Sequence, residues 1–119
     1  MQIEIQTQDF SLTDALRSHV QRRLCLMLSR FGDHAQRIIV RLSDINGPRG
    51  GADKRCHIQV ALDQLPDVVV EDIETDLYVA IDRAADRAGR TVARRLSRSW
   101  VRERSSGLVD KPLLLATKT

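Results

Sequence analysis

Hydrophobic and polar positions follow two different periods along this chain. Apolar residues alternate with polar ones in residues 1–7, 37–44 and 54–63, the pattern of a strand with one buried face. A short apolar run at residues 67–73 fits a fourth strand. The glycine-rich stretch 47–53 separates the second and third segments, so these two segments predict a hairpin with a loose tip.

Two longer segments show helical spacing instead. The first runs from about residue 12 to 31, with Ser11 as the expected N-cap and Gly32 as the expected C-cap. The second begins near Asp76, and one side of it carries the apolar residues Tyr78, Ile81, Ala85, Ala88, Val92 and Leu96. The order strand, helix, three strands, helix predicts an α+β fold.

Arginine is concentrated in the second predicted helix. Residues 83–104 hold eight arginines and two acidic residues, a local balance of +6, although the whole chain carries only +3. On a helical wheel five of these arginines form one outward row, here called the arginine stripe: Arg83, Arg87, Arg90, Arg94 and Arg98. The planar guanidinium suits phosphate oxygens, so the stripe favours an acidic or nucleic-acid partner. The alternative is a solvated helix face that binds nothing.

Three stretches of the sequence resemble one protein family. They are "FSLTDALRSHV" at 10–20, "DLYVAID" at 76–82 and "ARRLSR" at 93–98. All three are similar to segments of the ribosome hibernation-promoting factors, also called ribosome-associated inhibitor or sigma-54 modulation proteins. The resemblance covers about residues 1–100. It is to the short type of the family, because the residues after Arg104 are too few for an added dimerisation domain.

The resemblance implies both a fold and a function. The fold is a four-stranded sheet with two helices packed on one face, similar to a double-stranded-RNA-binding domain. The implied function is that of a stress or stationary-phase factor, which occupies the decoding channel of the small ribosomal subunit. There it would block messenger and transfer RNA and inhibit translation. The implied partners are 16S-type ribosomal RNA and ribosomal proteins.

Arginines on both predicted helices are the candidate contacts with ribosomal RNA, because phosphate and shape recognition require outward basic side chains and no base-specific code. The predicted contacts are Arg22, Arg23, Arg30, Arg83, Arg87, Arg90, Arg94, Arg95 and Arg98. Two aromatic residues are further candidates for stacking on a base. Tyr78 has a rival role in the core or at its rim, and Trp100 has a rival role in covering the end of the sheet.

A second hypothesis comes from a different class of function. The chain could be a protein-binding adaptor whose arginine stripe meets an acidic partner such as a sigma factor. Enzyme functions find no support, because His19, His34 and His57 are not spaced as metal ligands and spacing alone indicates no pairing of a cysteine or serine with a histidine. The sequence therefore predicts a non-enzyme with no cofactor, no metal and no small-molecule substrate.

The chain is expected to form one domain at residues 1–104, followed by a flexible tail at 105–119. No apolar run is long enough to cross a bilayer, and the first residues lack the pattern of a secretory signal, so we expect a cytoplasmic protein without a membrane partner. We expect Cys25 and Cys56 to be buried thiols rather than a disulfide. The free protein is expected to be a monomer.

Overall fold

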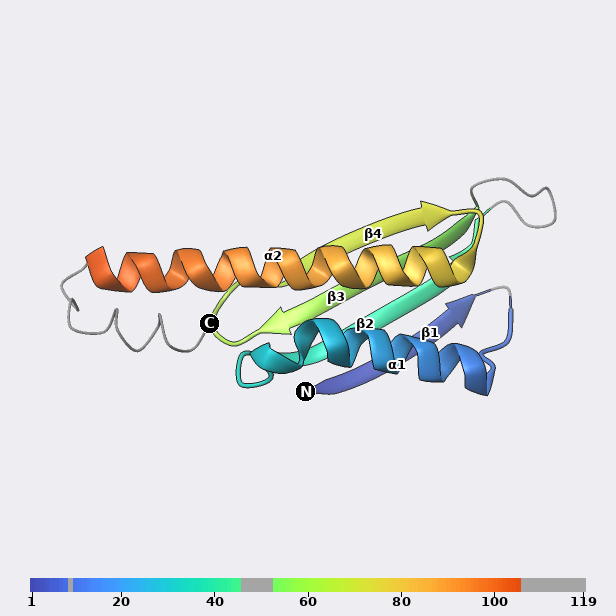
Figure 1. Ribbon diagram of the computed structural model, residues 1–119, viewed down its shortest axis with the longest axis horizontal. Helices are drawn as coiled ribbons and strands as arrows, with labels where there is room; N and C mark the ends of the chain where they lie inside the picture. The colour runs from blue at the N-terminus through green and yellow to red at the C-terminus, as the bar shows by residue number, and fades with distance from the viewer. Residues whose placement is uncertain (9, 46–52, 106–119) are drawn as a thin grey trace. The chain divides into compact units, whose positions relative to one another are not determined.

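The computed structural model describes residues 1–8, 10–45 and 53–105 of this 119-residue chain (Figure 1). Its elements are β1 (Gln2–Gln8), α1 (Asp14–Leu28), the 3-10 turn η1 (Ser29–Phe31), β2 (Ala35–Asp44), β3 (Lys54–Leu62), β4 (Val68–Glu74) and α2 (Leu77–Ser105). This order confirms the predicted α+β fold and its sequence of elements. The glycine-rich stretch 47–53 lies, apart from Asp53, outside the described residues, and so does the tail from residue 106 onward.

The chain divides into two compact units, Met1–Gly89 and Arg90–Thr119, and the boundary falls within α2. The first unit holds the whole sheet, α1 and the first part of α2. The second unit begins with the rest of α2. The arginine stripe is therefore divided, with Arg83 and Arg87 in the first unit and the other three members in the second.

The first unit is built on a mixed sheet with the strand order β1-β2-β3-β4. β1 pairs with β2 in parallel, whereas β2 with β3 and β3 with β4 are antiparallel. In Figure 1, α1 and the first part of α2 both lie in front of the sheet, which confirms that the helices of this unit cover one face. Among the described residues of this unit, no helix lies on the opposite face of the sheet, which is called the open face below.

The core of the first unit forms where the apolar period of the helices meets the alternating period of the strands. On α1 every fourth residue is buried: Leu16, Val20, Leu24 and Leu28. The strands contribute their inward residues, including Ile38, Val40, Leu42, Cys56, Ile58, Val60, Val68 and Val70. Early α2 adds Ala80, Ile81, Ala84, Ala85 and Ala88. Burying this much aliphatic surface is the main stabilising term for a unit of this size.

Small residues let α2 approach α1 closely. A Cβ atom built on Gly89 would lie 3.1 Å from the Met27 carbonyl oxygen and 3.3 Å from the Met27 Cβ. Glycine is a poor helix former, so its presence inside α2 has a packing reason. The absence of a side chain at this position allows the two helix backbones to meet near the end of α1.

Three local predictions were wrong. The C-cap of α1 is Ser29, not Gly32, which caps the following 3-10 turn η1 instead. The N-cap of α1 is Thr13, not Ser11: its Oγ1 accepts a hydrogen bond of 3.1 Å from the backbone N–H of Leu16. Both residues can cap a helix, and the one closer to the first buried turn does so here. Cys25 is exposed, because it follows Leu24 and so lies about 100° around α1 from the buried row. Cys56 is buried as predicted.

Candidate nucleic-acid interface

The two arginines of the stripe that belong to the first unit are paired with acidic residues of β4. Arg83 Nε lies 3.6 Å from Glu74 Oε2. Arg87 donates a 2.6 Å hydrogen bond from Nη1 to the backbone carbonyl oxygen of Glu71, and its Nη2 lies 3.4 Å from Asp72 Oδ1. Both side chains are exposed, yet the carboxylates of Glu74 and Asp72 partly balance their positive charge. Their first structural role is to tie the start of α2 to the edge strand β4.

The acidic partners of these arginines also interact with each other. A hydrogen bond between the two carboxyl groups, helped by desolvation and by the charge of Asp72, raises the pKa of Glu74 above its usual value. The charge of Arg83 acts in the opposite direction. Asp72 and Glu74 thus form a pair of carboxyl groups beside the two arginines. Any phosphate that reaches Arg83 or Arg87 must compete with these carboxyl groups.

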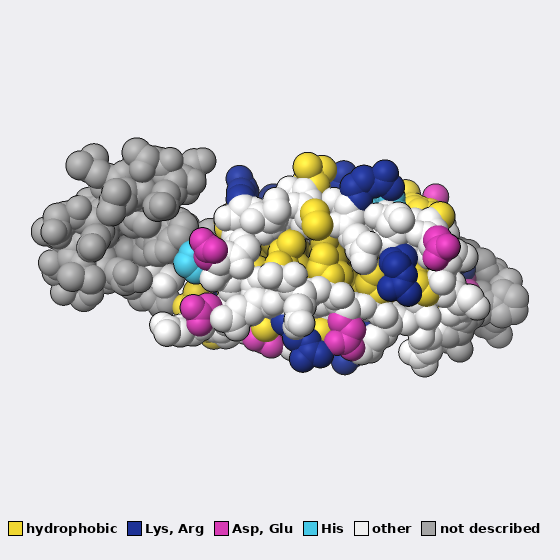
Figure 2. Space-filling model, turned by 90° about the horizontal axis from the view of Figure 1, so that it is seen from below, with side chains coloured by type: hydrophobic (Ala, Val, Ile, Leu, Met, Phe, Trp, Pro, Cys, Tyr) yellow, Lys and Arg dark blue, Asp and Glu magenta, His cyan; other side chains and the backbone are white. Residues whose placement is uncertain are grey.

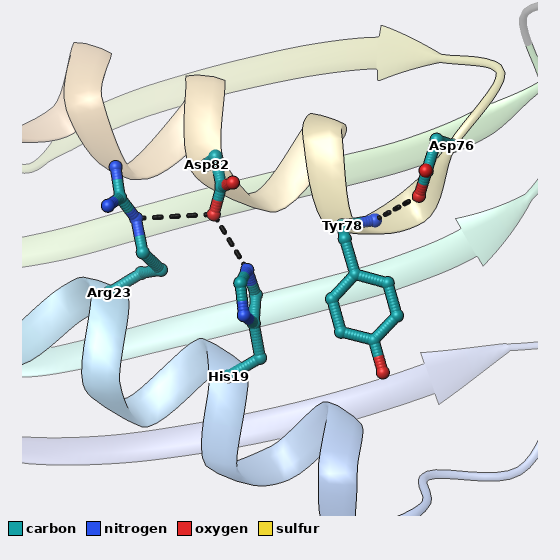
Figure 3. A network of polar contacts seen from close by, with 5 residues as sticks. All are labelled: His19, Arg23, Asp76, Tyr78 and Asp82. Carbon is teal, nitrogen blue, oxygen red and sulfur yellow. Dashed lines mark hydrogen bonds and ion pairs between the residues drawn. The ribbon is translucent and has the colours of Figure 1, made fainter.

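A second internal network holds Arg23 between the two helices (Figure 3). One carboxylate oxygen of Asp82 on α2 contacts two side chains of α1. His19 Nε2 lies 2.7 Å from Asp82 Oδ1, and Arg23 Nε lies 3.2 Å from the same oxygen. His19 and Arg23 stand one turn apart on α1, so both can reach the same carboxylate. Arg23, a predicted contact with RNA, therefore takes part in the helix-helix interface of the first unit.

Tyr78 lies at the rim of this network. Its side chain is 40% exposed, and its ring meets the His19 ring edge-on, with centroids 4.8 Å apart and planes at 78°. Its backbone N–H donates a hydrogen bond of 2.9 Å to Asp76 Oδ1 at the beginning of α2 (Figure 3). The geometry matches the rim role that the wheel position allowed. The stacking role of Tyr78 stays a prediction.

The remaining arginines of the stripe lie in the second unit. Arg90, Arg94 and Arg98 are all exposed and recur at four-residue spacing, so they occupy one side of α2 within that unit. The Nη2 of Arg94 lies 3.5 Å from the hydroxyl oxygen of Thr91. Arg95 is half-buried beside this row. The side chain of Trp100 lies outside the described part, so its stacking role stays a prediction.

The other predicted contacts of the first helical region are Arg22 and Arg30. Arg22 is exposed on α1. Arg30, in η1, places its guanidinium carbon 4.8 Å from the centroid of the Phe31 ring, a cation-π contact that leaves the charge at the surface.

In Figure 2, on the side where α1 and β1 lie nearest, basic and acidic side chains of the described residues are interspersed around apolar ones. Charge on this side is therefore mixed.

Sequence reasoning missed a polar hollow on the open face of the sheet. It has a volume of about 440 Å³ and is lined by residues of β1, β2 and β3, namely Gln6, Thr7, Gln8, Arg41, Leu42, Ser43, Arg55 and His57. The period-two alternation that marks the buried positions also assigns Arg41, Arg55 and His57 to the outward face. This alternation is present in the sequence, but it cannot show that outward side chains of three different strands border one hollow.

Among the described residues, no three His, Cys, Asp or Glu side chains gather closely enough to hold a metal ion. In the same part of the chain, no helix is both long and apolar enough to span a membrane.

Comparison with known proteins identifies the family. The profile of the family described as "Sigma 54 modulation protein / S30EA ribosomal protein" matches residues 3–99. The chain belongs to this family. The resemblance to the hibernation-promoting factors and sigma-54 modulation proteins is thus confirmed. No curated protein matched the chain in a comparison of sequences.

Solved structures agree with this membership. The N-terminal domain of Protein Y from Thermus thermophilus is 36% identical and superimposes with a TM-score of 0.66, over 79% of this chain and 98% of that one. A ribosomal subunit interface protein from Coxiella burnetii is 18% identical with a TM-score of 0.68, over 82% of this chain and 99% of that one. At that identity the second match supports the shared fold alone.

Proposed function

We propose that this protein is a ribosome-binding factor of the cytoplasm that occupies the decoding channel of the small ribosomal subunit, blocks messenger and transfer RNA, and inhibits translation under stress or in stationary phase. Family membership over residues 3–99 supports a ribosomal partner. So does the 36% identity to the N-terminal domain of Protein Y. Residues 1–104 would form the ribosome-binding part of the chain.

The row Arg90, Arg94 and Arg98 is the observation that carries the proposal. These guanidinium groups are exposed and regularly spaced on one side of a helix, and each offers several N–H donors to phosphate oxygens. Contacts of this kind fix a protein on RNA through its backbone and shape without reading bases. Arg22, Arg30 and Arg95 are further candidates for the same role.

Arg23, Arg83 and Arg87 are weaker candidates, since each already pairs with a carboxylate of the first unit. For these three, binding RNA means exchanging an internal ion pair for a phosphate contact, so the net gain is smaller. We therefore propose that these three arginines mainly stabilise the fold and contribute less to RNA binding.

The test is binding of the full chain to isolated small ribosomal subunits across a salt series. Each arginine that neutralises a phosphate releases counterions, so the combined change Arg90→Ala, Arg94→Ala and Arg98→Ala should make the log-log salt slope shallower by about two to three units. At physiological salt the triple variant should bind at least about tenfold more weakly than the wild type. Its melting temperature should be nearly unchanged because exposed charges contribute little to folding.

The matched control is Arg17→Ala, which removes an exposed arginine of α1 that is not among the predicted contacts. It should behave like the wild type, whereas Arg94→Ala alone should shift the slope by about one unit. Equal behaviour of the triple variant and the wild type would reduce the arginine row to a solvated helix face. Recovery of one acidic protein and no ribosomal subunits in a pull-down would favour the adaptor function instead.

A further inference from the structure

The hollow on the open face gathers hydrogen-bond donors from three strands. The register aligns Gln6, Arg41 and His57 in one row across β1, β2 and β3, and the next outward row contains Ser43 and Arg55. Residues two apart on a strand point to the same face and are about 7 Å apart, so the two rows border one depression. All these residues line the hollow.

Arg41 is oriented by its neighbours on β1. Its Nε donates a hydrogen bond of 3.1 Å to the side-chain oxygen of Gln6, and the Gln6 amide nitrogen donates one of 2.8 Å to Glu4. Within the described part of the chain this uses one of the five N–H donors of the Arg41 guanidinium. The chain of bonds holds the guanidinium over the sheet through the neutral side chain of Gln6. The nearby carboxylate of Glu4 is paired with Arg37, whose hydrogen bond is the main cause of its lowered pKa, and the charge of Arg41 is only a minor cause.

The β3 side of the hollow carries a guanidinium group and, among the described residues, a buried polar atom that lacks a hydrogen-bond partner. Arg55 forms an ion pair with Glu71, which lies on β4 opposite His57. Within the described part of the chain, the Nδ1 atom of His57 is buried and has no hydrogen-bond partner. A buried polar atom without a partner usually indicates a missing water, ion or ligand group nearby.

From this arrangement we propose that the hollow lined by Arg41, Ser43, Arg55 and His57 binds a backbone phosphate of RNA, as a contact separate from the arginines of α2. A phosphate group accepts several hydrogen bonds at once, which matches a depression bordered by the Arg41 guanidinium, a hydroxyl and an imidazole. Arg55 adds less to this site because it already pairs with Glu71. The inference rests on the proposed function for the identity of the partner. The phosphate chemistry follows from the hollow alone.

A direct test follows the histidine side chains of the full chain by NMR, with ¹⁵N-labelled histidine, during titration with inorganic phosphate and with a short 5′-phosphorylated oligouridylate. The ring signals of His57 should shift with both ligands. His19, which is held by Asp82 on the helix-covered side, and His34 serve as internal references and should not shift. Sodium chloride at the same ionic strength should shift none of them.

A matched pair of variants on one strand then connects the hollow to ribosome binding. Arg41→Gln removes a charge that borders the hollow, whereas Arg37→Gln removes a charge from the same face of β2 that is paired with Glu4. Arg41→Gln should weaken the response of His57 to the oligouridylate about tenfold and lower affinity for small subunits by about fivefold. Arg37→Gln should change both by less than about twofold.

Equal effects of Arg41→Gln and Arg37→Gln, or equal shifts of all three histidines, would overturn the inference while leaving the proposed function intact. A response of His57 to hexaglutamate but not to the phosphorylated ligands would also overturn it, in favour of an acidic protein. If wild-type protein failed to bind small subunits but His57 still responded to phosphate, the proposed function would fail and the phosphate site would stand.

Discussion

Replacing Asp82 tests whether Arg23 belongs to the fold or to the RNA interface. Asp82 is the shared partner of His19 and Arg23 and joins α2 to α1 within the first unit. Asp82→Ala removes both contacts and releases Arg23, whereas Arg23→Ala removes one contact and leaves Asp82 with His19. The double variant closes a thermodynamic cycle that isolates the Asp82 to Arg23 interaction.

The expected magnitude follows from exposure. The Asp82 side chain is 41% exposed and the Arg23 side chain is 29% exposed, so water screens their attraction. We expect a coupling free energy of about 0.5–1 kcal/mol for this pair, in the upper range for surface ion pairs. Asp82→Ala loses the hydrogen bond to His19 as well, so it should lower the free energy of unfolding by about 1–2 kcal/mol. For a chain of this size that corresponds to a melting temperature lower by about 4–8 °C.

The assay combines chemical denaturation of all four proteins of the cycle with binding to small ribosomal subunits. Arg23→Ala should lower stability but change affinity by less than about twofold, because its charge is already engaged. Asp82→Ala should bind at least as tightly as the wild type, since it removes a negative charge and frees a positive one. The reasoning is refuted if the two single changes are additive in stability, or if Arg23→Ala weakens binding tenfold at an unchanged melting temperature.

Three further predictions concern packing and chemistry in the first unit. At pH 8 a thiol reagent should label Cys25 alone in the native protein and both cysteines after unfolding, because burial raises the pKa of Cys56 from 9.0 to about 12. The contribution of the protonated Cys56 thiol to the free energy of unfolding is complete below pH 9 and should fall as the pH rises toward 12. Gly89→Ala should lower the free energy of unfolding by about 1 kcal/mol despite alanine's better helix propensity, since its methyl group would press on the Met27 backbone, and a higher melting temperature would contradict this. Thr13→Ala should cost about 1 kcal/mol by urea denaturation, and an equal loss from Ser11→Ala would contradict the observed cap.

Strand and helix positions could be predicted because each depends on a local pattern. The alternation in residues 37–44 and 54–63 gave β2 and β3 to within two residues, since inward and outward positions are set by the pleat itself. The N-cap was predicted at Ser11 but lies at Thr13, because both side chains can accept the capping bond and only the backbone geometry at Thr13 decides. The turn residue Gln64, with φ of 61°, gives no sequence signal comparable to a glycine.

The candidate site was harder to predict because charge partners are distant in sequence. A helical wheel shows that Arg83 and Arg87 face outward, but it cannot show that β4 places Asp72 and Glu74 beside them. Likewise the pairing of Arg23 with Asp82 joins residues 59 positions apart in the chain. Such pairings depend on which elements become neighbours in the fold, information that no single-element pattern contains.

These pairings change how basic residues should be weighed when RNA contacts are sought. A count of arginines measures total charge, but a phosphate is attracted by the charge that remains after internal ion pairs have formed. Arg23, Arg83 and Arg87 each have a carboxylate partner in the first unit, whereas Arg90, Arg94 and Arg98 are proposed as contacts because they are exposed and recur on one side of α2. Arg41 is a further candidate because its hydrogen-bond partner Gln6 is neutral and orients it over the open face. We therefore expect a phosphate to gain least at the arginines whose carboxylate partners the fold already supplies.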